Sequence, residues 1–175
     1  VTRVLILGAG IIGILTASIF KKEGKSVSIY DINDFRSHKA VNLSFDKHTT
    51  GKNYDVVINT TSSTNGLNLA IELVRKEGLI IEASWYGKGY QNIKLSGRFH
   101  FDRLQIKSSQ VSCIPEYLQG KWDFLTRKQK CLSYLLDEQY EAYIDRIIDF
   151  EELPAEFSKI RKNQMDYLSL LVKYQ

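Results

Sequence analysis

The sequence predicts an α/β protein built on a doubly wound parallel sheet of the Rossmann type. Three observations lead to this prediction. A glycine-rich loop lies between a buried strand and a helix, strands alternate with helical segments of about 10 to 15 residues, and an acidic residue follows the second strand. Units of this kind cross over with a right hand and form an open, twisted sheet.

The first part of the chain carries the clearest elements. Val4–Leu7 is a short apolar run that ends at glycine, which is typical of a strand buried on both faces. Ile11–Glu23 then has the pattern of a helix, with Gly24 in the usual position of a helix stop. Ser26–Tyr30 alternates apolar residues with serines and is predicted as a second strand.

The following stretch, residues 34–53, is polar and weakly patterned, and we expect at most a short strand over Val41–Leu43. The βαβ pattern then returns with three elements: a buried strand over Tyr54–Asn59, a helix over Asn65–Glu77 that Gly78 ends, and a strand over Leu79–Ala83.

The second half is less regular. We expect an extended strand over Arg103–Val111 and a helix over Phe124–Leu136, with its leucines directed inward at positions 125, 132, 135 and 136. Leu153–Ile160 is predicted as a short helix with Pro154 in its first turn. Met165–Tyr174 fits a strand or a helix equally well.

Composition excludes several classes of protein. The longest nearly apolar stretch, Ile11–Phe20, is too short for a membrane span, which needs about 20 apolar residues. The net charge of +4 comes from interspersed charges, so we expect no nucleic-acid or membrane partner. Cys113 and Cys131 are too few for a disulfide framework or a structural zinc site. With no secretory signal visible, we expect a cytoplasmic protein.

The most informative segment is Gly8-Ala9-Gly10-Ile11-Ile12-Gly13, a G-x-G-x-x-G loop that follows a strand and opens a helix. Gly8 permits the tight turn, Gly10 lets a pyrophosphate approach the backbone, and Gly13 allows the helix to pack closely on the sheet. The first residues of the helix, Ile11 and Ile12, offer unpaired backbone N–H groups to the phosphates. The loop therefore predicts a dinucleotide site.

Asp31 lies 18 residues after Gly13, at the end of the second strand. A carboxylate at this place accepts hydrogen bonds from the adenosine ribose and repels a 2′-phosphate. The sequence therefore favours NAD over NADP. Arg36 follows closely; its charge softens that preference, or its guanidinium stacks on the adenine.

Further cofactor-site residues are expected where strands end, because ligands of doubly wound sheets lie outside the carboxyl ends of the strands. Thr60, Thr61 and Ser62 follow one strand, and Ser84, Trp85 and Tyr86 follow the next. We take Thr60, Thr61, Ser84 and Trp85 as candidate cofactor contacts. Turn or strand capping explains such hydroxyls equally well.

Other nucleotide-binding proteins share this loop. Doubly wound methyltransferases have a glycine loop and an acid after the second strand, and regulatory domains of potassium channels bind nucleotides in a similar way. Methyltransferases usually carry an acid in or before the loop, whereas Val4–Leu7 is wholly apolar.

Taken with these motifs, four stretches make the chain resemble the medium-chain dehydrogenase/reductases, the superfamily of zinc-type alcohol dehydrogenases. They are the strand and loop over residues 4–13, the segment Tyr54–Thr60, the segment Arg75–Ser84 and the tail Phe150–Phe157. The tail is the most specific of them. Arg98–Val111 is also similar to one bacterial branch of the family.

The resemblance implies the cofactor-binding half of such an enzyme, without the catalytic domain that supplies the zinc ligands and the proton relay. Residues 1–139 would form the NAD-binding domain, and residues 140–175 would return to complete the catalytic domain, present in cis or in trans. The helix and strand after Asp31 must be shortened. Ser84, Trp85 and Tyr86 would face the nicotinamide, and Ser108 and Ser109 would reach its carboxamide.

We expect no catalytic residue and no metal in this chain, because His38, His48 and His100 form no zinc-ligand pattern. Alone, the chain would bind NAD(H), transfer little or no hydride to or from an alcohol or carbonyl, and tend to associate; the family often dimerises through sheet edges. The alternative is a non-catalytic nucleotide-sensing or interaction module that keeps only the Rossmann domain.

Overall fold

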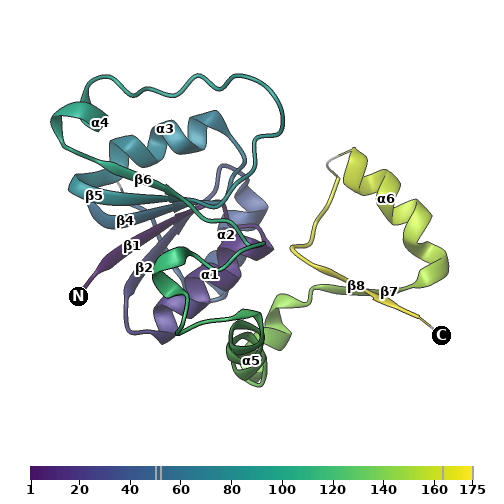
Figure 1. Cartoon of the computed structure of the whole chain (residues 1–175). Helices are drawn as coiled ribbons and strands as arrows, with labels where there is room; N and C mark the ends of the chain where they lie inside the picture. Colours follow the sequence, from purple (N-terminus) through teal and green to yellow (C-terminus); the bar gives the residue numbers. More distant parts are fainter. Residues whose placement is uncertain (50, 52, 163, 175) are drawn as a thin grey trace. The chain divides into compact units, whose positions relative to one another are not determined.

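The computed structural model describes every residue except Thr50, Lys52, Asn163 and Gln175, and it leaves out the side chains of residues 138 and 139. The chain divides into two compact units, residues 1–113 and residues 114–175, which are drawn in Figure 1 and are described one at a time.

The first unit is built on a parallel sheet. Within the described residues, its strands have the order β3-β2-β1-β4-β5-β6. This is the order of a doubly wound Rossmann sheet, with the reversal between β1 and β4. The strands are β1 (Arg3–Leu7), β2 (Ser26–Tyr30), β3 (Asp46–Lys47), β4 (Tyr54–Asn59), β5 (Val74–Glu82) and β6 (Gln105–Ser108). The predicted fold class is confirmed.

Helices cover both faces of this sheet. They are α1 (Ile11–Lys22), α2 (Asp34–Asn42), α3 (Thr64–Leu73) and the short α4 (Arg98–Phe101). Figure 1 shows α3 on one side and α1 with α2 on the other. Successive strand residues point to opposite faces, so a sheet covered on both sides buries continuous apolar runs, as β1 does from Val4 to Leu7.

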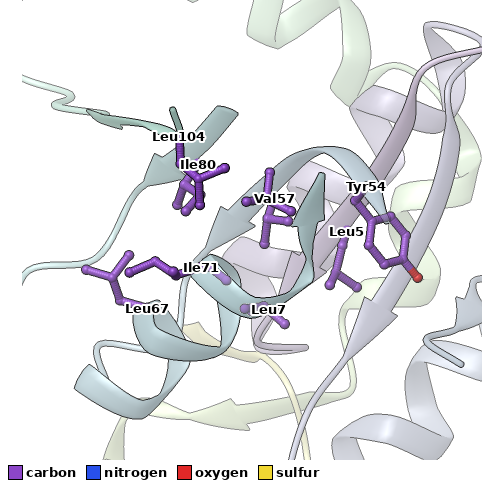
Figure 2. Close-up of a cluster of buried hydrophobic side chains, with 10 residues drawn as sticks. Leu5, Leu7, Tyr54, Val57, Leu67, Ile71, Ile80 and Leu104 are labelled. Atoms are coloured by element: carbon purple, nitrogen blue, oxygen red, sulfur yellow. The ribbon is translucent and has the colours of Figure 1, made fainter. Parts of the chain in front are cut away.

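The core on the α3 side joins three neighbouring strands to that helix (Figure 2). Its buried side chains are Leu5, Leu7, Tyr54, Val57, Leu67, Ala70, Ile71, Val74, Ile80 and Leu104. This packing fixes the carboxyl ends of β1, β4 and β5 relative to one another, and those ends carry the candidate site.

The prediction for residues 34–53 was wrong in one respect. α2 is a helix where only polar coil or a strand over Val41–Leu43 was expected. Its buried residues are Ser37 and Ala40, which produce no apolar period, and the Asn33 side chain caps it by accepting from the Arg36 N–H at 3.0 Å. The expected shortening is present, because β3 has only two residues.

The helix after β4 ends earlier than predicted. α3 stops at Leu73 rather than Glu77, and Gly78 lies inside β5 instead of ending the helix. The guanidinium of Arg98 donates to the carbonyls of Ile71, Glu72 and Val74 and so satisfies the end of α3. A distant side chain therefore sets this boundary.

In the second unit, two parallel strands, β7 (Arg146–Asp149) and β8 (Leu170–Lys173), form a separate small sheet. β7 was not predicted, and β8 resolves the ambiguity of residues 165–174 in favour of a strand. The helices are α5 (Phe124–Leu135) and α6 (Leu153–Arg161), and short 3-10 turns cover Glu116–Leu118, Glu138–Tyr143 and Phe150–Glu152.

The predicted inward face of α5 was wrong, because Leu125, Leu132, Leu135 and Leu136 are exposed and the helix buries none of its residues. Contacts within the chain place the boundary of the units at Cys113. Whether residues 140–175 complete a catalytic domain depends on a domain that this chain does not span, so that assignment stays a prediction.

Candidate functional site

The glycine loop is held in a tight turn at the carboxyl end of β1. Gly8 has a φ of +98°, which side chains rarely adopt, and its N–H donates to the carbonyl of Tyr30 at 2.8 Å. A Cβ on Gly13 would lie 1.8 Å from the carbonyl oxygen of Gly8. Only glycine at position 13 therefore lets α1 start directly against the loop.

The middle glycine has a different environment. A Cβ on Gly10 would meet no atom within 4 Å, so this position opens onto free space. Gly10 is the N-cap of α1, and the first turn of the helix contains no acidic residue. The first N–H groups of a helix have no partner within it. The loop thus presents these donors and the positive end of the helix dipole, around Ile11 and Ile12, to a bound anion.

Asp31 faces this loop from the end of β2. One carboxylate oxygen accepts the Ala9 N–H at 2.7 Å, and the other accepts the Asn33 N–H at 2.8 Å. Each carboxylate oxygen has two lone pairs, so each can accept one more hydrogen bond. Asp31 therefore ties the loop to β2 and keeps acceptor capacity for hydroxyl groups of a ligand.

The turn after β4, residues 60–63, closes the opposite side. The Thr60 N–H donates to the carbonyl of Leu7 at 2.8 Å, and its hydroxyl donates to the same carbonyl at 2.9 Å. The turn therefore meets the end of β1 at the point where the strand order reverses. This switch point is where doubly wound sheets bind their ligands.

These parts line one cavity of about 340 Å³, a size typical of small-ligand sites. It brings together six of the predicted residues: Gly8, Gly10, Asp31, Arg36, Thr60 and Thr61. It also contains lining residues that the sequence analysis did not select: Leu7, Tyr30, Ile32, Ser63, Asn65, Gly66 and Leu69. Leu7, Tyr30 and Ile32 flank predicted positions, whereas Asn65, Gly66 and Leu69 come from α3, for which the strand-end rule carries no signal.

Five predicted residues do not line this cavity: Ile11, Ile12, Gly13, Ser84 and Trp85. Ile11 and Ile12 form the first turn of α1 behind Gly10, and Gly13 packs on the loop itself. The hydroxyl of Ser84 accepts the Ser62 N–H at 2.9 Å, and Trp85 is 75% exposed. The structure therefore gives Ser84 a contact to the turn 60–63 and leaves the indole of Trp85 in solvent.

A partly buried polar network lies at the ends of β4 and β5, next to the cavity-lining residues Thr60 and Thr61. The fully buried Asn59 donates to a carboxylate oxygen of Glu82 at 2.8 Å and to the Tyr86 hydroxyl at 2.9 Å, and the same hydroxyl donates to Glu82 at 2.7 Å. Burial, and then the adjacent Glu82 carboxylate, raise the pKa of Tyr86 well above its ordinary value. The hydroxyl of Tyr86 is therefore a protonated donor at neutral pH.

Three further expectations concern a metal site, a membrane span and the serines at positions 108 and 109. The described residues contain no group of three or more His, Cys, Asp or Glu side chains able to hold a metal. In the same part of the chain, no helix is long and apolar enough to cross a membrane. Of the two serines expected near a carboxamide, Ser108 ends β6, and the N–H of Ser109 donates to the backbone carbonyl of Glu82 at 2.8 Å.

Comparison with solved structures finds the same fold in known dehydrogenases. A 2R,3R-butanediol dehydrogenase from Bacillus subtilis matches with a TM-score of 0.76 at 18% identity, over 99% of this chain and 51% of its own. A protein from Escherichia coli described as a short chain alcohol dehydrogenase, complexed with NADH, matches with a TM-score of 0.77 at 19% identity, over 99% of this chain and 52% of its own. The yhdH oxidoreductase from Salmonella enterica, in complex with NADP, matches with a TM-score of 0.73 at 14% identity, over 99% and 55%.

The chain thus spans about half the length of these solved proteins. No family model and no curated protein sequence matches it. At identities of 14–19%, these matches show that the chain shares its fold with half of each solved dehydrogenase.

Proposed function

We propose that this chain is the NAD(H)-binding part of an alcohol dehydrogenase-like oxidoreductase, with NAD preferred over NADP. The single observation that carries the proposal is the pairing of the glycine loop with Asp31 across one cavity, joined by the 2.7 Å hydrogen bond from the Ala9 N–H. The complexes of the solved relatives with NADH and with NADP support a dinucleotide as the ligand.

The residues of the cavity fit such a ligand. Gly10 faces open space that a Cβ would enter, so a pyrophosphate can approach the N-terminus of α1. Asp31 has acceptors left for two ribose hydroxyls, and its negative charge opposes a 2′-phosphate. Arg36 lines the same cavity and offsets part of that repulsion.

When bound, the nicotinamide would supply the chemistry, a hydride exchanged with an alcohol or carbonyl carbon. The loop amides would hold the phosphates, Asp31 would orient the adenosine, and the turn 60–63 would form the facing wall. We assign no proton-transfer group to this chain. That role would belong to a catalytic domain in cis or in trans, corresponding to the half of the relatives that the chain does not span.

The proposal is tested by calorimetric titration of the chain with NADH and NADPH, alongside Asp31→Ala. A hydrogen bond to a charged group contributes about 1.5–3 kcal/mol, so the variant should bind NADH roughly 10- to 100-fold more weakly. It should also lose the preference over NADPH, because the repelling charge is removed.

Asp34→Ala is the matched control, because it removes a nearby carboxylate that does not line the cavity. It should keep both affinities within about twofold, a difference well under 1.4 kcal/mol. Failure of the unmodified chain to bind either cofactor at millimolar concentration would overturn the proposal.

A further inference from the structure

The turn 60–63 has a backbone that needs support. Three of its residues, Thr60, Thr61 and Ser63, line the cavity. Between them, Ser62 has a φ of +53°, in the left-handed region that residues other than glycine rarely adopt. A strained conformation persists only where the surroundings over-determine it, and such positions cluster at functional sites.

Asn59 provides the central support. Its side-chain carbonyl accepts both the Thr61 N–H at 3.2 Å and the Thr61 hydroxyl at 2.8 Å. The Thr61 oxygen in turn accepts the Ser63 N–H at 3.2 Å. The Asn59 oxygen therefore holds Thr61 directly, and the Thr61 hydroxyl extends this support to Ser63 on the other side of the strained Ser62.

Glu82 fixes the orientation of that amide. An ionised carboxylate only accepts hydrogen bonds, so the NH₂ of Asn59 must face Glu82 and its carbonyl must face the turn. Glu82 also accepts the Tyr86 hydroxyl and the Ser84 N–H. No cation among the described residues forms a salt bridge with Glu82. Glu82 therefore acts in the network by accepting hydrogen bonds from neutral donors.

α3 packs directly against this arrangement. A Cβ on Gly66 would lie 2.1 Å from the hydroxyl oxygen of Thr61 and 2.8 Å from the side-chain oxygen of Asn59. The turn therefore packs against the Asn59–Glu82 network and against Gly66 of α3, which also lines the cavity.

We propose that Asn59, oriented by Glu82, is a positioning residue that preorganises the turn 60–63 as a wall of the dinucleotide site. This inference rests on the proposed function. Preorganisation raises affinity because the ordering of the turn does not have to be completed on binding. The carbonyl of Asn59 then contributes to affinity without touching the ligand.

The test exchanges the two polar partners. Asn59→Asp places two carboxylates face to face, so we expect NADH affinity to fall by roughly tenfold or more, which corresponds to about 1.4 kcal/mol. In Asn59→Asp with Glu82→Gln, the glutamine amide donates to the new carboxylate, whose other oxygen still accepts from Thr61. NADH affinity should return to within about threefold of the original, as a coupled pair requires.

Asn68→Asp is the matched control. Asn68 lies on α3, and its side chain bonds the backbone of Asn92 and Lys94 instead of the turn. This change should lower the free energy of unfolding and leave NADH affinity unchanged. Equal losses of affinity in Asn68→Asp and Asn59→Asp would mean that Asn59 acts only through stability, which would overturn the inference.

Hydrogen exchange gives a second readout that needs no ligand. The Thr61 and Ser63 amides should exchange faster in Asn59→Asp and regain protection in the double variant. Where Asn59→Asp does not fold, Glu82→Gln alone is used, with faster exchange in the turn and weaker NADH binding expected. NADH binding by the unmodified chain that is not weakened in Asn59→Asp, or in Glu82→Gln where that variant replaces it, overturns this inference alone. Absence of binding by the unmodified chain overturns the proposed function.

Discussion

Residues 1–113 bury layers of aliphatic side chains on both faces of a sheet, whereas residues 114–175 bury mainly aromatic and charged ones. In the second unit the buried residues are Tyr140, Tyr143, Ile148, Tyr167 and Glu156. Its two-stranded sheet leaves Ile147 and Leu171, which pair in register, 54% and 46% exposed.

The difference indicates how each unit obtains its stability. An aliphatic core supplies burial without any need for polar partners. Buried hydroxyl and carboxylate groups must be satisfied, and a parallel sheet is normally covered on both faces. The first unit therefore has a closed apolar core of its own, while the small sheet of the second leaves apolar side chains exposed. We expect another domain to cover them.

The largest expected effect comes from matched truncations in the two cores. Ile80→Ala, at a fully buried position of the first unit, should lower the free energy of unfolding by about 2–5 kcal/mol. Ile148→Ala, at a position that is 3% exposed, should lower the free energy of unfolding by an amount at the lower end of that range. The neighbouring Leu170 and Val172 are only half-buried, so the structure around the lost side chain can collapse more easily.

Hydrogen exchange with mass spectrometry measures both truncations, because it follows each unit separately. Ile148→Ala should speed exchange only in peptides from residues 114–175. Uniform loss of protection along the whole chain would instead show that the two units unfold together.

The next effect concerns the two glycines of the loop. Gly13→Ala introduces a Cβ 1.8 Å from a backbone oxygen and should cost about 1–3 kcal/mol of stability. Gly10→Ala meets no atom and should cost less than about 1 kcal/mol, yet it should weaken NADH binding because its methyl group enters the space proposed for the pyrophosphate. Thermal unfolding and titration separate the two; unchanged NADH affinity in Gly10→Ala would contradict the proposed place of the phosphates.

A smaller effect is expected from pH. Burial would raise the pKa of Glu156, but its hydrogen bond to Lys159 and the charges of Arg146 and Lys159 outweigh burial and hold the pKa below its ordinary value. A carboxylate with a lowered pKa stabilises the fold at pH values above its unfolded-state pKa of about 4.3, and loses that contribution as the pH falls through its folded-state pKa. Protection of the second unit should therefore decrease on acidification below about pH 4.3.

Glu156→Gln should remove this part of the pH dependence, as followed by the exchange of peptides from residues 114–175. Glu151→Gln, which changes an exposed glutamate nearby, should leave the profile unchanged. The explanation would fail if both variants kept the same pH profile.

The smallest effect on stability is expected on the exposed face of the small sheet. Ile147→Lys and Leu171→Lys should change the free energy of unfolding by no more than about 0.5 kcal/mol. Both should reduce self-association in sedimentation velocity, because they remove apolar surface that we expect a catalytic domain to cover. Leu125→Lys on α5 is the comparison variant. If only this variant reduces self-association, the surface through which the chain associates lies on α5 instead.

Local sequence patterns were sufficient for most of the first unit. β2 and β4 have the predicted bounds, and β1 and α1 differ from the prediction only at their ends. Each has an apolar period and a glycine or strand end that marks its limit, so neighbouring residues carry the information. The same reasoning located Gly8, Gly10 and Asp31 around one cavity, because the carboxyl ends of adjacent parallel strands must meet.

The sequence prediction failed on three features: the presence of α2, the end of α3 and the burial of α5. α2 buries serine and alanine, so nothing in its pattern indicated a helix. The end of α3 is set by Arg98, which lies 25 residues after Leu73. The leucines of α5 have a helical period that predicted burial, but nothing in the described structure covers them.

The sequence by itself determined β1, α1, β2 and β4, the glycine loop and the acid that faces it, because spacing, turn glycines and apolar runs act over a few residues. Only the tertiary structure decided that Asn65, Gly66 and Leu69 of α3 wall the cavity and that Asn59 and Glu82 support the turn beside it. The physical reason is that a buried hydrogen-bond network depends on distances between strands, and no local pattern of residues specifies those distances.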